Sequence, residues 1–179
     1  LAAAQGDSQA FDTAGSIWTT AMSYSFDGSN DTMTGTFTST YDVPITLACW
    51  IKFTDHPIAS DRMVMLGNSS SSNSSNINIR TSATDNQFIA ETQGTGSGTA
   101  NANVVKTGID ATWTPCIGVF ISDSSRAIYV SDVSDTGAGT EAAADLFQFI
   151  RLGESFTGTN DYTGLLAEVA IWDKELSAG

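Results

Sequence analysis

The sequence predicts an all-β protein, a sandwich of two antiparallel sheets in a jelly-roll arrangement. Apolar and polar residues alternate along many short runs, as they do in strands with one buried face. Segments rich in Ser, Gly, Asn and Asp separate these runs, which is the composition of turns. Helical periodicity is nearly absent. About ten short strands without intervening helices favour a sandwich or jelly roll over an α/β fold.

The first strand is expected at residues 22–27, where Met22, Tyr24 and Phe26 share one face. Residues 27–31 then predict a turn, because Gly and Asn tolerate positive φ. The run Glu-Ala-Ala-Ala-Asp at 141–145 predicts at most one helical turn. Further strands are expected at residues 43–53, 63–67, 76–80, 87–91, 102–106, 116–122, 127–131, 147–153 and 164–172.

The chain is expected to divide into an arm and one domain. Residues 22–179 predict the jelly-roll domain, and the 41% hydrophobic content of the chain suits a single core. Residues 1–21 are less regular, with Phe11, Ile17 and Trp18 as apolar anchors. They predict an N-terminal arm that packs on the sandwich or on a neighbouring chain, and a neighbouring copy would make the protein a homo-oligomer.

The charge balance excludes two classes of partner. Twenty acidic residues against seven basic ones give a formal net charge of −13. Such a surface repels nucleic acid, because binding needs Lys or Arg to replace condensed counterions, and it repels anionic membranes for the same reason. No run approaches the roughly 18 apolar residues that membrane insertion needs. Abundant Ser, Thr and Asn are typical of secreted and particle-surface proteins, so an extracellular or virion-surface location is expected.

The two cysteines, Cys49 and Cys116, lie in strand-like runs. Buried free thiols are favoured over a disulfide, because free Cys packs as a small hydrophobic residue. A disulfide would enclose a long loop and require an oxidising compartment. The chain contains no CxxC spacing, so a zinc site is not expected.

Seven segments resemble one superfamily, and they occur in the family's order. They are YSFDGSNDTM at 24–33, ITLACWIKF at 45–53, VMLG at 64–67, WTPCIGVF at 113–120, RAIYVSD at 126–132, FIRLG at 149–153 and GLLAEVAIWDKELS at 164–177. This set is similar to the concanavalin A-like lectins and glucanases, specifically the laminin-G-like jelly-roll branch. Two departures stand out: Trp113 precedes Thr-Pro where the family has two histidines, and Tyr129-Val-Ser-Asp132 lacks the usual turn glycine.

The resemblance makes catalysis a question, since glucanases of this superfamily carry E-x-D-x-x-E on one strand, so that alternate carboxylates act as acid and nucleophile. None of the glutamates begins that pattern; they are Glu91, Glu141, Glu154, Glu168 and Glu175. The single histidine, His56, lies in a turn with no nucleophile motif beside it. The sequence therefore predicts a non-catalytic protein.

The resemblance also implies a structural Ca²⁺ at the rim of the sandwich. Asp27, Asn30 and Asp31 offer the oxygen ligands that calcium prefers, and Glu168 is expected to come close to them. The alternative is that Asp27 and Asn30 bond their own backbone, as turn residues do.

Glu168 interrupts an apolar run, which needs an explanation. Strict alternation places Leu165, Ala167, Val169 and Ile171 between the sheets and Glu168 on the other face, beside Trp172. A carboxylate there needs a partner or water. The candidates are Arg126, Arg151 or a calcium ion, and an ion pair is favoured.

Aromatic residues carry the remaining functional signal. Glycan-binding jelly rolls stack sugars on exposed rings, so Trp18, Tyr41, Trp113 and Tyr162 are candidate ligand-binding platforms. The alternative for each is packing in the core or at an interface.

Two classes of function follow from these observations. The first is a non-catalytic recognition module that binds glycan or another surface ligand. The second is a structural protein that decorates a viral capsid or surface layer through protein–protein contacts with neighbouring chains. The acidic, lysine-poor composition and the N-terminal arm favour the second. The first is favoured because members of the superfamily often bind ligands.

Overall fold

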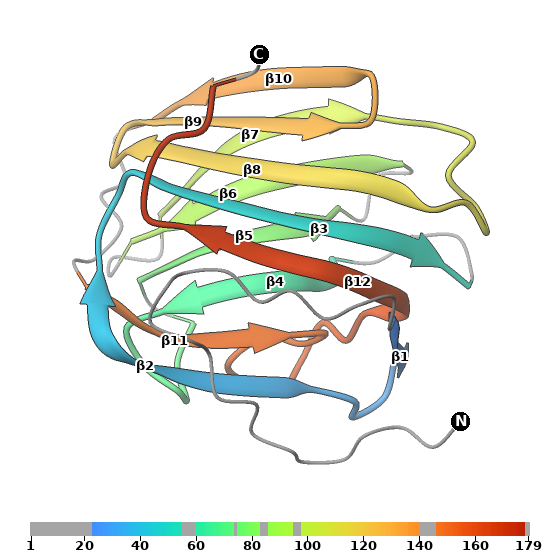
Figure 1. Ribbon diagram of the computed structural model, residues 1–179, viewed down its shortest axis with the longest axis horizontal. Helices are drawn as coiled ribbons and strands as arrows, with labels where there is room; N and C mark the ends of the chain where they lie inside the picture. Colours follow the sequence, from blue (N-terminus) through green and yellow to red (C-terminus); the bar gives the residue numbers. More distant parts are fainter. Residues whose placement is uncertain are drawn as a thin grey trace.

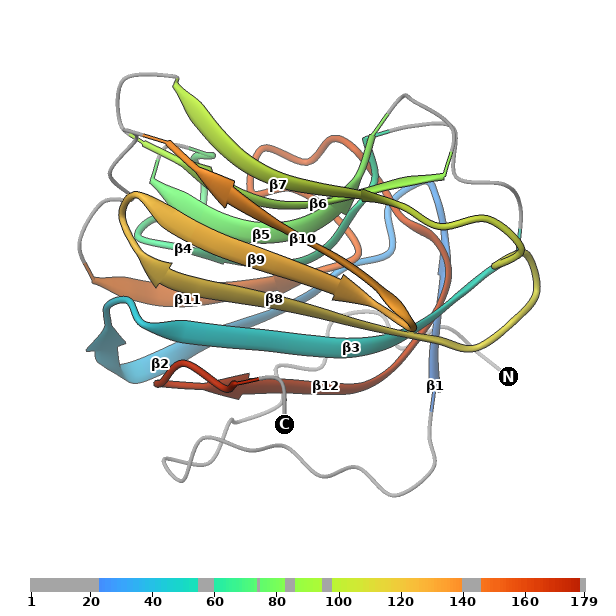
Figure 2. The same cartoon turned by 90° about the horizontal axis from the view of Figure 1, so that it is seen from above.

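The computed structural model describes residues 23–54, 60–73, 75–82, 86–94, 98–139 and 146–177. These residues form two antiparallel six-stranded sheets packed face to face, so the predicted all-β sandwich is confirmed (Figures 1 and 2). Within these ranges no helix has the length and apolar character to cross a membrane. The predicted arm at 1–21 and helical turn at 141–145 lie outside the described residues.

Strand order within each sheet follows from the pairing of the strands. The front sheet of Figure 1 contains, in order, β1 (Ser23–Asp27), β12 (Thr163–Trp172), β3 (Ile45–Phe53), β8 (Thr114–Ser122), β9 (Ser125–Val130) and β10 (Val133–Ala138). The back sheet contains β2 (Met33–Tyr41), β11 (Phe147–Leu152), β4 (Arg62–Gly67), β5 (Asn76–Thr81), β6 (Gln87–Gln93) and β7 (Thr99–Val105). The first and last strands of the chain, β1 and β12, pair in the front sheet, with Ser23 opposite Ala167.

All ten predicted strands are present, and their boundaries agree with the prediction within three residues. Two strands, β2 and β10, were not predicted. Both lie at the edge of a sheet, where one side has no neighbouring strand in that sheet. Their sequences, MTGTFTSTY and VSDTGA, contain few large apolar residues, so alternation alone does not identify them.

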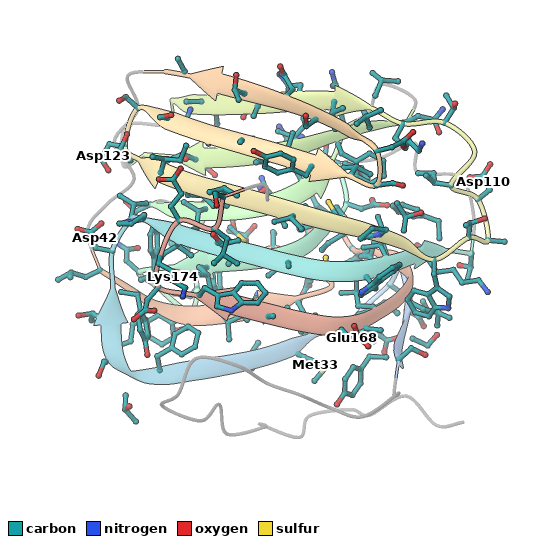
Figure 3. All side chains as sticks on the ribbon, turned by 45° about the horizontal axis from the view of Figure 1, so that its top comes forward. Met33, Asp42, Asp110, Asp123, Glu168 and Lys174 are labelled. Atoms are coloured by element: carbon teal, nitrogen blue, oxygen red, sulfur yellow. The ribbon has the colours of Figure 1, made fainter. Side chains whose placement is uncertain are left out.

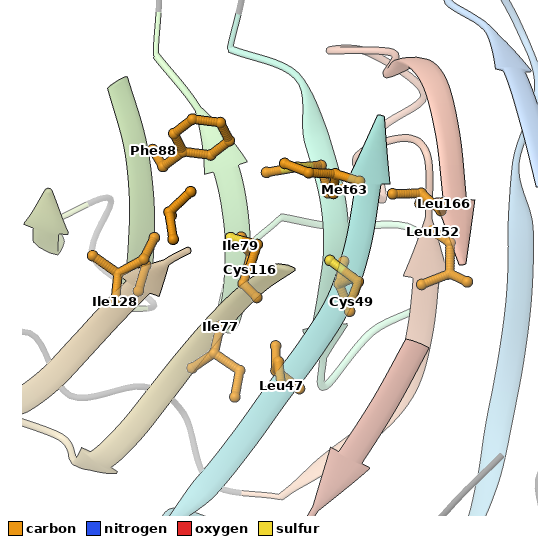
Figure 4. Close-up of a cluster of buried hydrophobic side chains, with 14 of the residues drawn as sticks. Leu47, Cys49, Met63, Ile77, Ile79, Phe88, Cys116, Ile128, Leu152 and Leu166 are labelled. Carbon is orange, nitrogen blue, oxygen red and sulfur yellow. The ribbon is translucent and has the colours of Figure 1, made fainter. Parts of the chain in front are cut away.

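The core fills the space between the sheets. Strand β3 shows the alternation clearly, because Ile45, Leu47, Cys49, Ile51 and Phe53 are buried while the residues between them face outward. Figure 4 shows Leu47 and Cys49 of the front sheet among Ile77, Ile79 and Phe88 of the back sheet. This packing orients the outward residues of β3, one of which is Trp50.

Strand β12 departs from strict alternation at a bulge. Ala167 pairs with Trp50 and Ala170 pairs with Ala48, so two residues, Glu168 and Val169, lie opposite Cys49 alone. A bulge of this kind places one extra residue in a strand and shifts its alternation by one.

The bulge corrects the predicted faces of β12. Before it, Leu166 is buried in the core, whereas Leu165 and Ala167, which were predicted to face inward, are only half-buried. After it, Val169 and Ile171 pack against the core as predicted. Glu168 itself lies on the exposed side.

Candidate functional site

Two of the three tryptophans within the described residues lie in strands of the front sheet, and the third lies directly before such a strand. Trp50 lies at an outward position of β3 between the buried Cys49 and Ile51 and is 39% exposed. Trp172 ends β12 one residue after Ile171, which packs inward. Trp113 immediately precedes β8 and is 37% exposed.

A groove lies on the outer face of the front sheet between Trp50 and Trp172. Ala48 of β3 pairs with Ala170 of β12 on one side and with Ile117 of β8 on the other, and both alanines are too small to fill the space between two indoles. The resulting cavity has a volume of about 150 Å³. We call it the tryptophan groove; it is lined by Ala48, Cys49, Trp50, Pro115, Ile117, Glu168, Ala170 and Trp172.

Glu168 is the charged residue of this lining, and the bulge displays it there (Figure 3). Its φ of 48° lies in the left-handed region that non-glycine residues rarely adopt. Bulges and residues in costly backbone conformations occur often at functional sites, which makes Glu168 a candidate functional residue.

The predicted ion pair of Glu168 is wrong. Arg151 lies in the back sheet, where its Nη2 is 3.3 Å from Glu154 Oε2. Arg126 is buried, and its Nη2 donates a hydrogen bond to the carbonyl of Asp123 at 2.8 Å. No described side chain forms an ion pair with Glu168, which is exposed and therefore hydrated.

The residues predicted to hold calcium do not form one site. The backbone N–H groups of Asp27 and Ser29 donate to Asp31 Oδ2 and Asp27 Oδ1, each at 2.9 Å, so the turn carboxylates satisfy their own backbone. Asp27 pairs with Thr163, five residues before Glu168 on β12. Asn30 is exposed in the same turn. Within the described residues, no group of three or more His, Cys, Asp or Glu side chains is arranged to hold a metal ion.

The predicted aromatic platforms differ in how far their rings are exposed. Tyr162 is fully buried, and its hydroxyl donates to the carbonyl of Leu165 at 3.1 Å, so this candidate is wrong. Tyr41 is half-buried and packs edge-on against Phe37, with ring centroids 5.1 Å apart. Trp113 is exposed, as a platform needs to be. Trp18 and the single histidine lie outside the described residues.

Sequence reasoning missed Trp50 and Trp172. For Trp50 a signal existed, because it occupies the outward phase of the alternating run ITLACWIKF. Trp172 was expected on the outward face of its strand, beside Glu168, and it lines the groove there. The alternation reached that face with Leu165 and Ala167 inward, whereas in the structure Leu166 is buried and the bulge restores the outward position of Trp172.

The two thiols beside the groove have low reactivity. Cys49 and Cys116 are both free and buried, as predicted, and they lie opposite each other on β3 and β8 (Figure 4). Burial raises the pKa of Cys49 to about 12 and that of Cys116 well above its usual value. Because the thiolate is the nucleophile, neither thiol is suited to covalent chemistry at neutral pH.

A charged network occupies the outer side of the back sheet. Glu91, which is 2% exposed, accepts hydrogen bonds from Arg62 Nη1 at 2.7 Å and from Arg80 Nη2 at 2.6 Å. Asn78 Nδ2 donates to the same carboxylate at 3.1 Å. Every oxygen of Glu91 is therefore occupied, which suits a structural role rather than a catalytic one.

A second cluster of acidic side chains lies at the start of β4. Burial, together with the nearby Asp161, raises the pKa of Asp61 to about 6. Burial also raises the pKa of Glu154, against the lowering effect of Arg151. These acids lie beside the loop that joins β11 to β12, where the backbone N–H of Arg62 donates to Asn160 O.

Solved structures similar to this fold come from diverse proteins. A heptameric SAP-like pentraxin from Limulus polyphemus has a TM-score of 0.66 at 15% identity, covering 87% of this chain and 77% of the pentraxin. Domains LG4–5 of the mouse laminin α1 chain have a TM-score of 0.62 at 12% identity; the match covers 87% of this chain and 44% of that one. The CBM40 domain of a Ruminococcus gnavus sialidase, bound to α2,3-sialyllactose, has a TM-score of 0.59 at 10% identity, covering 79% and 90%.

These identities establish the shared fold alone. No curated protein matches the sequence. A family model does match, and it covers residues 26–179, which include all the elements that form the groove. The chain therefore belongs to the Laminin_G_3 family of the concanavalin A-like lectin/glucanases superfamily.

Proposed function

We propose that the protein is a non-catalytic recognition module that binds glycan in the tryptophan groove, at an extracellular or virion surface. The observation that carries the proposal is the pair of indoles, Trp50 and Trp172, on either side of a floor of small residues. Ligand sites are mostly apolar hollows with a few polar groups that fix orientation. A sugar ring suits this site because its C–H face packs on an aromatic ring while its hydroxyl groups face a polar rim.

Glu168 supplies the polar group. A carboxylate accepts hydrogen bonds from ligand hydroxyls, and bonds to a charged acceptor are stronger than those between neutral groups. No described protein group competes for its oxygens. The similar CBM40 domain was solved with a bound oligosaccharide, which supports a glycan ligand for this fold.

Recognition without cleavage fits the carboxylates of the groove. Glycosidases of the common type use two carboxyl groups across the scissile bond, one as acid and one as base or nucleophile. Of the groove-lining residues, Glu168 alone has a carboxylate. The proposed binding needs no calcium ion, because the groups that carry it are the two indoles and the Glu168 carboxylate.

A structural role in a capsid or surface layer is the second candidate. The apolar lining of the groove, with Pro115 and Ile117 beside the indoles, would also suit a neighbouring protein chain. In that case the groove would take an apolar side chain of a neighbour, and the protein would occur in symmetric copies.

A glycan array with matched variants separates the two candidates. The parent protein is expected to be retained on a subset of glycans, and Trp50→Ala and Trp172→Ala are expected to lose retention. The control is Val105→Ala, which truncates a side chain that is 55% exposed on the back sheet. Each variant should melt close to the parent temperature.

Retention of no glycan would refute the recognition role. If sizing or electron microscopy then finds symmetric copies that Trp50→Ala disrupts, the structural role is supported instead.

A further inference from the structure

The third tryptophan extends the aromatic surface beyond the groove. Thr114, the first residue of β8, pairs with Ile51 and is buried, so alternation turns Trp113 outward, two positions from Pro115. The segment before it is attached to the end of β3, where Ala111 N–H donates to Phe53 O at 3.3 Å. Trp113 therefore lies level with Lys52 on the outer face.

The register places the three tryptophans along a diagonal across β12, β3 and β8. Trp172 pairs with Thr46, four residues before Trp50 on β3, and Trp50 pairs with Pro115. With a rise of about 3.4 Å per residue and about 4.8 Å between strands, the Cα separations are about 14 Å from Trp172 to Trp50 and about 8 Å from Trp50 to Trp113. The full row spans about 23 Å on the same geometry, which is longer than one sugar ring.

We propose that this row binds an extended, uncharged glycan chain of several sugars, with Trp113 as an outer platform that a short ligand does not reach. The proposal rests on the glycan-binding role proposed above and names its ligand class. A site for a single terminal sugar would need only the groove, and it would leave Trp113 as an isolated exposed indole.

Charge argues for a neutral chain. Glu168 in the groove and Lys52 beside Trp113 contribute opposite charges, so these two residues give the row no net charge that would select an anion. At longer range the formal charge of −13 repels sulfated, sialylated or uronic-acid polymers. A neutral chain has no such barrier, and its hydroxyl groups can donate to Glu168.

Chain-length dependence tests the proposal. Isothermal titration would compare neutral linear di- and hexasaccharides of glucose, mannose, galactose and xylose on the parent, Trp113→Ala and Val105→Ala. For the sugar type that binds, the parent is expected to bind the hexasaccharide about three- to tenfold more tightly than the disaccharide, because a further aromatic contact contributes roughly 0.5–1.5 kcal/mol. Trp113→Ala is expected to remove that gain and to leave disaccharide affinity within about twofold of the parent.

The outcomes distinguish this inference from the proposed function. Equal affinities of the parent for both lengths, or an equal loss for both lengths in Trp113→Ala, would overturn the extended site and leave glycan binding intact. Tighter binding of heparin or polygalacturonate than of the neutral chains would overturn the charge argument and the ligand class with it. Binding of no saccharide at all would overturn the proposed function as well.

Discussion

Replacing Glu91 by glutamine tests whether the back sheet depends on its buried charged network. The substitution keeps the shape of the side chain and one carbonyl oxygen, but it removes the negative charge between Arg62 and Arg80. Both guanidinium groups are largely buried, and each lies within 2.7 Å of the carboxylate. In the variant they remain buried without a counter-charge.

The expected loss of stability is about 3 kcal/mol. Removing one partner of a buried ion pair costs about 3–5 kcal/mol, and glutamine keeps one acceptor, which favours the lower end. For a chain of this size the melting temperature should fall by about 6 to 12 °C. Urea unfolding followed by tryptophan fluorescence should show a lower midpoint at an unchanged slope.

The difference between the parent and Glu91→Gln should also depend on pH. Burial alone would raise the pKa of Glu91, but Arg62 and Arg80 outweigh it and hold the pKa below its usual value. A lowered pKa in the folded state stabilises the protein above the unfolded pKa of about 4.3, and this contribution is lost as the pH falls through the folded value. The advantage of the parent should therefore be full at neutral pH and shrink in acid.

The control is Glu175→Gln, an exposed glutamate after β12, which should unfold within about 0.5 kcal/mol of the parent. If Glu91→Gln proved equally mild at neutral pH, the network would contribute little to stability. The assignment of Glu91 to a structural role would then fail.

Three further outcomes follow from buried groups and close contacts. Neither of the two thiols should react with Ellman's reagent in the folded protein, and both should react in denaturant, as their burial requires. Asp61→Asn should gain stability over the parent between about pH 4 and about pH 8, by up to about 3 kcal/mol, because burial raises the folded pKa to about 6 and the parent loses stability as its carboxyl ionises; urea midpoints at both pH values measure this. Gly153→Ala should destabilise by about 3 kcal/mol or more, since φ is +81° and an added Cβ would lie 2.1 Å from the Phe26 ring. At Gly108 φ is +71° and an added Cβ would meet open space, so Gly108→Ala should lose only the stability that the strained backbone costs. Urea midpoints of both glycine variants measure the difference.

Alternation predicted the fold because most strands bury one full face. In β3 every second residue is buried, and the pattern is visible in the letters ITLACWIKF. The same reasoning failed at β2 and β10, since an edge strand needs fewer apolar side chains. The pattern of a single strand does not show how that strand is aligned with its neighbour. The pairing of Ala48 with Ala170, which opens the groove, could therefore not be predicted.

The candidate site was less predictable than the fold for a specific reason. Whether an aromatic ring is buried depends on which strands cover it, so Tyr162 and Trp113 look alike in sequence although one is in the core and the other is exposed. The predicted calcium ligands failed through distance, because the register separates Asp27 from Glu168 by five residues along β12.

The bulge at Glu168 links these arguments, and its removal should separate stability from function. Deleting Glu168 would leave Val169 opposite Cys49 and would keep the pairs of Ala167 and Ala170 unchanged. The shortened β12 would then have no bulge and would not need the positive φ found at Glu168. It would alternate regularly and keep the same residues in the core. The deletion variant should therefore melt at or above the parent temperature and yet lose glycan affinity. A variant that unfolds would make the bulge a structural requirement, and a variant that still binds would show that Glu168 takes no part in recognition.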